Sequence, residues 1–96
     1  MREKITRHLL IRGRVQGVGF RNYMDYKAGQ LGISGWVRNC SDGSVEAVVH
    51  GTPATVAAII ECAQRGPRAS HVSGVTVSDD GNDENFGDRF ETRDTV

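Results

Sequence analysis

The sequence predicts an α+β fold in which an antiparallel sheet carries two helices on one face. Short segments that alternate apolar and polar residues are bounded by turn residues, as in strands with one buried face. Two longer segments repeat their apolar residues every three or four positions, as in amphipathic helices. The order of these segments along the chain then predicts the topology.

A glycine-rich loop separates the first strand from the first helix. We expect the strand over residues 6–12, the loop over 13–19 and the helix over 20–31, with Gly32 as the stop signal of the helix. Apolar residues recur at helical spacing in this helix, at Phe20, Met24, Ala28 and Leu31. This stripe predicts that one side of the helix packs on the sheet.

A hairpin follows the first helix. Strands are expected over residues 33–39 and 44–50, because Ser41-Asp42-Gly43 between them is a turn signal. The second of these strands alternates two sets of side chains, which predicts one buried face and one partly solvated face. The two sets are Val45, Ala47 and Val49, and Glu46, Val48 and His50.

The second helix opens at Thr52-Pro53, because proline is favoured at the first helical position, and stops at Gly66-Pro67. A fourth strand is expected over residues 72–77. Residues 79–88 are rich in Asp, Asn and Gly and are expected to form a mobile loop, and residues 89–93 a short edge strand.

The order strand, helix, strand, strand, helix, strand is that of a ferredoxin-like split βαβ sandwich, with the short C-terminal strand as an addition. A chain of 96 residues is long enough to bury one modest core. We therefore expect a single domain over residues 1–96.

The net charge of zero hides an asymmetry between the two parts of the chain. Residues 1–38 hold eight Lys and Arg and two acidic residues, whereas residues 39–96 hold four basic and ten acidic residues. The glycine-rich loop lies in the basic part, which favours an anionic ligand there. The acidic residues at 79–94 are expected to form a solvated loop and tail.

Composition excludes several classes of protein. No apolar segment approaches the roughly 20 residues that span a bilayer, and the apolar run 9–11 is too short for a secretory signal, so we expect a cytoplasmic protein. Cys40 and Cys62 form no CxxC motif, which argues against a structural zinc site. We expect free thiols, with a single disulfide as the alternative.

The loop at 13–19 has the composition of an anion site. Its three glycines permit tight turns that bring main-chain N–H groups together, and the N-terminus of the next helix adds partial positive charge. Arg21 adds a permanent charge and a fork of donors that fits phosphate oxygens. The loop is not a Walker A motif, since position 18 is Val. It is not a dinucleotide fingerprint either, since position 22 is Asn.

Residues 11–21, Ile-Arg-Gly-Arg-Val-Gln-Gly-Val-Gly-Phe-Arg, resemble the first signature of the acylphosphatase family. Residues 35–39, Gly-Trp-Val-Arg-Asn, followed by Gly43, Val45 and Gly51, resemble the second. The resemblance covers roughly residues 5–93. It implies a small ferredoxin-like enzyme that hydrolyses the carboxyl–phosphate bond of acyl phosphates without a metal or other cofactor.

The resemblance also implies roles for individual residues. Arg21 would bind the substrate phosphate, and Asn39 would orient the attacking water. Main-chain amides of the loop would surround the phosphoryl oxygens. These amides belong to Val15, Gln16, Gly17, Val18, Gly19 and Phe20. From its position alone Asn39 has a second explanation, since asparagine is favoured beside turns.

Other polar residues near the motifs are expected to have lesser roles. The side chains of Arg14 and Gln16 are expected to be supporting or surface groups. Three histidines are expected to be strand residues rather than general bases; they are His8, His50 and His71. Cys40, next to Asn39, stands where many relatives of the family carry threonine.

Two other functions stay open at this point. One is a non-catalytic ferredoxin-like binding or regulatory module. An RNA-binding sheet would favour aromatic residues on its central strands, and the first and third strands contain none. A metal carrier would favour a CxxC motif in its first loop, and this loop contains no cysteine. The other is the acylphosphatase-like domain of hydrogenase-maturation carbamoyltransferases. The chain's length favours a stand-alone enzyme, and we expect a monomer that binds neither nucleic acid nor membrane.

Overall fold

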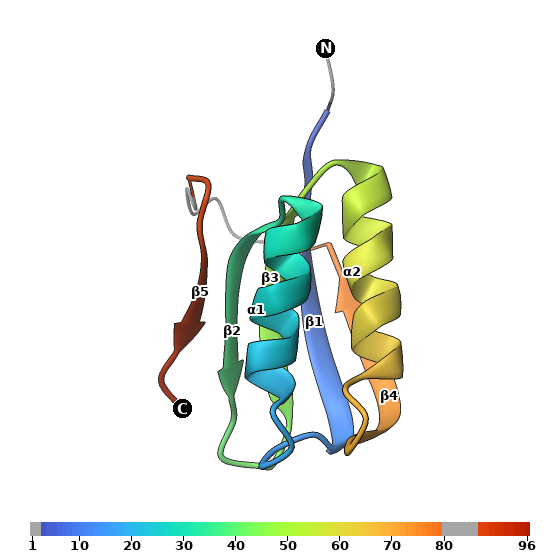
Figure 1. The fold of residues 1–96 in the computed structure, drawn as a ribbon, viewed down its shortest axis with the longest axis vertical. Coiled ribbons are helices and arrows are strands. Elements are labelled where there is room, and N and C mark those ends of the chain that lie inside the picture. The colour runs from blue at the N-terminus through green and yellow to red at the C-terminus, as the bar shows by residue number, and fades with distance from the viewer. Residues whose placement is uncertain (1–2, 80–86) are drawn as a thin grey trace.

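The structure is a computed structural model that describes residues 3–79 and 87–96 (Figure 1). Within these residues the secondary structure follows the predicted order, with the predicted C-terminal strand present. The elements are β1 (Ile5–Arg14), α1 (Phe20–Leu31), β2 (Ser34–Asn39), β3 (Val45–Gly51), α2 (Pro53–Arg65), β4 (His71–Ser78) and β5 (Phe90–Arg93). Most of the loop predicted over 79–88 lies outside the described residues.

The five strands form one sheet in the order β4-β1-β3-β2-β5. The four longer strands pair antiparallel, as the split βαβ prediction requires. β5 differs, because it lies parallel to β2 and pairs Thr92 with Val37. The sequence predicted this edge strand but not its direction or its neighbour. The parallel pairing brings the C-terminal part of the chain beside β2.

Both helices lie on one face of the sheet (Figure 1), and the core lies between the two layers. The predicted apolar stripe of α1 is buried at Phe20, Met24 and Ala28. The facing side chains of the sheet are also buried, and include Leu9, Ile11, Val37, Val45, Ala47 and Val49. Each large apolar side chain buried in this way contributes about 1.5–3 kcal/mol to folding.

The helix ends follow the predicted signals. Gly32 ends α1 in the left-handed conformation, with φ of 70°, and its N–H donates to the carbonyl of Ala28. Thr52 caps α2 by accepting the N–H of Thr55 at 3.2 Å, and Pro53 is the first helical residue. These local signals set the length of each helix.

The opposite face of the sheet is only partly solvated. Trp36 is 4% exposed, because the guanidinium groups of Arg38 and Arg93 lie over its ring at 4.6 and 4.9 Å from the ring centre. Val48, which pairs with Trp36, is buried as well. The face that the alternation predicted as partly solvated therefore contains a buried patch, formed by Trp36 and Val48.

The antiparallel pairing brings two chain segments to one end of the sheet (Figure 1). In β1, Ile11 pairs with Val45, and in β2 Asn39 pairs with the same residue. The loop that follows β1 and the turn that joins β2 to β3 therefore lie at the same end. The two signature segments of the sequence meet there.

Candidate active site

The backbone from the end of β1 through the loop to α1 takes its shape from three glycines. At Gly13 the pairing of β1 with β4 shifts register, and a Cβ there would lie 2.1 Å from the carbonyl oxygen of His71. Gly17 and Gly19 have φ of 72° and 80°, a conformation that side chains disfavour. Gly13 has a positive φ as well, at 125°, so this segment requires glycine at all three positions for backbone conformation and at Gly13 for space too.

The N-terminus of α1 opens toward this loop with its main-chain donors available. Gly19 is the N-cap residue, no side chain caps the helix, and its first turn contains no acidic residue. The first N–H groups of a helix have no partner within the helix, and they carry partial positive charge. This end of α1 can therefore hold an anion.

A cavity of about 290 Å³ lies at the loop. It is lined by Val15, Gln16, Gly17, Gly19, Phe20, Arg21, Asn22, Asn39 and Thr92. The structure thus brings Arg21, Asn39 and almost all of the predicted loop residues around one space. Val18 is the exception, since it packs against the core instead.

Two lining residues, Asn22 and Thr92, were not predicted from the sequence. Asn22 follows Arg21 in the first turn of α1, so helical geometry alone would have placed it near the loop. Thr92 lies on β5 and reaches the cavity only because β5 runs parallel to β2. No local signal in the sequence indicates that pairing.

Asn39 is the last residue of β2, and its backbone is held on both sides. It pairs with Val45 of β3, and its carbonyl, which points away from β3, accepts the N–H of Val96 at 3.2 Å. No non-glycine residue in the described ranges has a positive φ. Asn39 thus does not occupy the left-handed conformation that asparagine tolerates better than most residues.

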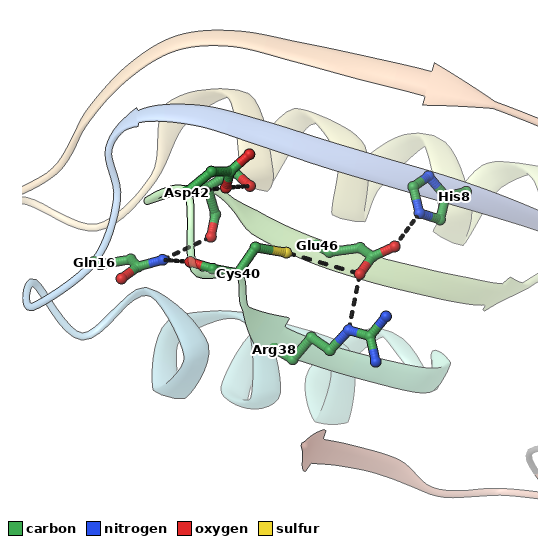
Figure 2. Close-up of polar contacts among 7 residues, drawn as sticks. His8, Gln16, Arg38, Cys40, Asp42 and Glu46 are labelled. Carbon is green, nitrogen blue, oxygen red and sulfur yellow. Dashed lines mark hydrogen bonds and ion pairs between the residues drawn. The ribbon is translucent and has the colours of Figure 1, made fainter. Parts of the chain in front are cut away.

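The turn after Asn39 is joined to the loop by one side chain (Figure 2). Nε2 of Gln16 donates to the carbonyl oxygens of Cys40 at 2.7 Å and of Ser44 at 2.8 Å. The Gln16 side chain therefore contacts the turn and is not a free surface group. Within the turn, the hydroxyl and N–H of Ser44 donate to Asp42, and these hydrogen bonds lower the pKa of the Asp42 carboxyl.

Glu46 on β3 contacts residues on either side of Asn39 (Figure 2). Its carboxylate accepts from Nε of Arg38 at 2.8 Å and lies 3.8 Å from the Cys40 sulfur. Nε2 of His8 donates to it at 2.6 Å. Burial by itself would raise the pKa of Glu46, but the hydrogen bonds and positive charges of His8 and Arg38 lower it overall.

Several other expectations can be compared with the structure. The three histidines lie on strands or at strand ends, outside the cavity lining. Cys40 and Cys62 are free thiols, so the disulfide alternative does not hold. In residues 3–79 and 87–96, no group of three or more His, Cys, Asp or Glu side chains is placed to hold a metal ion. No helix in those ranges is long and apolar enough to cross a membrane.

Comparison with known proteins gives one consistent result. The sequence model of the acylphosphatase family matches residues 7–92. An acylphosphatase from Thiobacillus denitrificans is 55% identical over 74 residues, which cover 77% of this chain and 83% of that protein. The acylphosphatase structure from Bacillus subtilis has a TM-score of 0.87 at 30% identity, covering 95% of this chain and 99% of that one.

A larger protein contains a similar unit. Full-length HypF, in its phosphate- and nucleotide-bound form, has a TM-score of 0.87 at 26% identity. The match covers 99% of this chain but 12% of HypF. The fold thus occurs both as a small protein and as a small part of a large one.

Proposed function

Because this chain belongs to the acylphosphatase family, we propose that it hydrolyses the carboxyl–phosphate bond of acyl phosphates to a carboxylate and inorganic phosphate. The observation that carries the proposal is the cavity at the end of the sheet. It combines the uncapped N-terminus of α1, an arginine in the first turn of that helix, and an asparagine from the neighbouring hairpin.

In the proposed mechanism, the loop amides from Val15 to Phe20 and the Arg21 guanidinium hold the phosphoryl group. Arg21 lies at the positive end of the α1 dipole, where a lone cation is unfavourable by about 0.3–1 kcal/mol. A bound phosphate offsets this repulsion. Donors already held in place stabilise the charge of the transition state with little reorganisation.

Asn39 places a water in line with the scissile P–O bond. Its amide both donates and accepts hydrogen bonds, so it can orient a water without taking its proton. Its backbone is paired at the end of β2, and it lines the same cavity as the loop. Positioning of this kind supplies much of the catalysis in phosphoryl transfer.

The leaving group explains why the site needs no general acid. A carboxylate is a weak base and leaves without protonation, and a non-bridging phosphate oxygen of the substrate accepts the proton of the water. The mechanism therefore uses neither a metal ion nor a histidine. We propose in addition that the chain acts as a single domain and a monomer in the cytoplasm, and that it binds no nucleic acid.

The experiment is hydrolysis of benzoyl phosphate by the natural protein, with and without excess EDTA. We expect equal rates in both conditions and much slower turnover of phenyl phosphate, whose leaving group is a stronger base. No hydrolysis of benzoyl or acetyl phosphate would overturn the proposed activity. Hydrolysis that stops on addition of EDTA would overturn the metal-independent mechanism alone.

A further inference from the structure

The side chain of Gln16 connects two parts of the site that lie far apart in the sequence. Its Nε2 is within 2.8 Å of two carbonyl oxygens, those of Cys40 and Ser44. An amide oxygen at this place would face two acceptors, so the hydrogen-bond pattern identifies the atom as nitrogen. Both protons of the amide are then donated, and no donor of this side chain is left for a substrate.

The two carbonyls are the ends of the β2–β3 turn. The turn is closed by its own backbone, because the N–H of Cys40 donates to Ser44 at 2.9 Å and the N–H of Gly43 to Cys40 at 3.1 Å. Asp42 closes it further by accepting both the N–H and the hydroxyl of Ser44. A turn closed in this way moves as a unit, together with Asn39, which directly precedes it.

The backbone conformation of the loop that carries Gln16 does not come from the turn. Its backbone conformation depends on Gly17 and Gly19 and on the start of α1. The loop and the turn are therefore two preformed units, and the Gln16 amide joins them (Figure 2). Arg21 belongs to the first unit and Asn39 to the second.

We propose that Gln16 is a positioning residue that sets the place of Asn39 relative to Arg21 and the loop amides. The proposal rests on the proposed function, since it assigns Gln16 to the same reaction. Without the Gln16 side chain the phosphate donors keep their arrangement, while the turn and Asn39 shift away from the loop. A displacement of about 1 Å at a reacting group can reduce the rate about 10²-fold.

The test is Gln16→Met, which keeps the length of the side chain and removes both donors. Gln64→Met, on the exposed side of α2, is the matched control. For Gln16→Met we expect kcat with benzoyl phosphate to fall about 10- to 100-fold. KM and the inhibition constant of inorganic phosphate should stay within about threefold, because the phosphate donors are untouched. Gln64→Met should match the natural protein.

A double substitution separates positioning from direct contact with the substrate. Because Gln16 acts through Asn39, adding Gln16→Met to Asn39→Ala should cause no further loss of kcat. Gln16→Ala repeats the test with a smaller side chain, in case Gln16→Met does not fold. Circular dichroism and thermal unfolding identify the folded variants.

Three results would overturn the inference in an active natural protein. They are an unchanged kcat in folded Gln16→Met, a weaker phosphate affinity in place of the kcat loss, and losses that multiply in the double variant. Absence of hydrolysis by the natural protein would overturn the proposed function instead, and the inference with it. The two failures are therefore distinguishable by the natural protein's own activity.

Discussion

The two halves of the candidate site are built in different ways. The loop between β1 and α1 offers main-chain donors, and its shape depends on the positive φ angles of Gly17 and Gly19. The β2–β3 hairpin offers the side chain of Asn39. Other side chains hold the residues beside it: Glu46 of the same hairpin bonds Arg38, and Gln16 of the loop bonds Cys40.

This difference predicts two kinds of failure. Damage to the loop should weaken phosphate binding, because the donors themselves are displaced. Damage to the hairpin should slow the chemical step and leave phosphate binding intact, because only the proposed water-orienting group moves. A variant of the loop should therefore change phosphate binding, and a variant of Asn39 should change the chemical step. The opposite result in either case would contradict the division.

Removing the charge of the loop should have the largest effect. We expect Arg21→Ala to reduce kcat/KM for benzoyl phosphate about 10³-fold, because a charged donor to the transferring phosphoryl group is lost. Inhibition by inorganic phosphate should be lost as well. Arg21→Lys should recover a small part of the activity, since it keeps the charge without the planar fork of donors. Arg68→Ala, at an exposed position outside the cavity lining, is the control. Undiminished activity in folded Arg21→Ala would remove the proposed phosphate anchor.

Removing the hairpin's functional group should come next. We expect Asn39→Ala to reduce kcat about 10²-fold, because the water is no longer oriented. The inhibition constant of inorganic phosphate should change less than about threefold, since the binding donors remain. Measuring kcat and phosphate inhibition on the same preparation checks both halves of this expectation. A large loss of phosphate affinity would instead place Asn39 among the binding groups.

Changing a glycine of the loop should have an intermediate effect. An alanine at position 19 must adopt φ near 80°, which costs about 1–2 kcal/mol, although open space surrounds the position. We expect Gly19→Ala to lower the free energy of unfolding by about 1 kcal/mol. We also expect it to weaken phosphate inhibition about tenfold, because a loop that relaxes away from the strained φ must regain it to bind, and 1.4 kcal/mol corresponds to a factor of ten in affinity.

The same substitution inside α1 is the matched control. Gly29 also has open space around it but no positive φ. Gly29→Ala should raise the free energy of unfolding by about 0.5–1 kcal/mol, because alanine loses less backbone entropy in a helix than glycine. Urea denaturation of both variants gives the comparison. Equal effects at the two positions would contradict a conformational requirement in the loop.

The smallest expected effect concerns the contacts that hold the hairpin. The pKa of Glu46 is lowered in the folded protein, so its ionised form stabilises the fold above its ordinary value of 4.5. This contribution is lost as pH falls below 4.5 and through the lowered folded-state pKa. We expect Glu46→Gln to reduce the free energy of unfolding at pH 7 by about 1 kcal/mol and to flatten its decline in acid.

Glu61→Gln is the control for this prediction, because Glu61 makes an exposed ion pair with Arg65 in which both side chains are more than 70% accessible. Exposed pairs of this kind contribute little, so its stability should stay close to that of the natural protein. The measurement is urea denaturation of the three proteins from pH 7 to pH 3. An unchanged acid dependence in Glu46→Gln would show that other carboxylates dominate it.

Most of the fold was predictable because its signals are local. The spacing of Phe20, Met24 and Ala28 indicated the buried side of α1, and Gly32 and Pro53 marked helix ends. The loop that lines the cavity was predictable for the same reason, since it is one continuous segment with glycines at positions of positive φ. A chain segment carries such information in its own side chains and backbone preferences.

The other half depended on pairing between distant residues. Asn39 is brought to the loop by strand pairing, Thr92 by the parallel pairing of β5, and Gln16 by two hydrogen bonds across 24 and 28 residues. The buried Trp36 patch likewise requires Arg93 to lie beside β2. None of these contacts follows from a local pattern.

The sequence alone therefore determined the order and type of the elements, the positions of the loop glycines and the resemblance to acylphosphatases. Dihedral preferences and side-chain periodicity act over a few residues, so they can be read along the chain. Only the tertiary structure showed that Asn22 and Thr92 also line the cavity and that the side chain of Gln16 joins its two halves. Those contacts form when distant segments pack together, and their geometry comes from the whole sheet rather than from any segment of it.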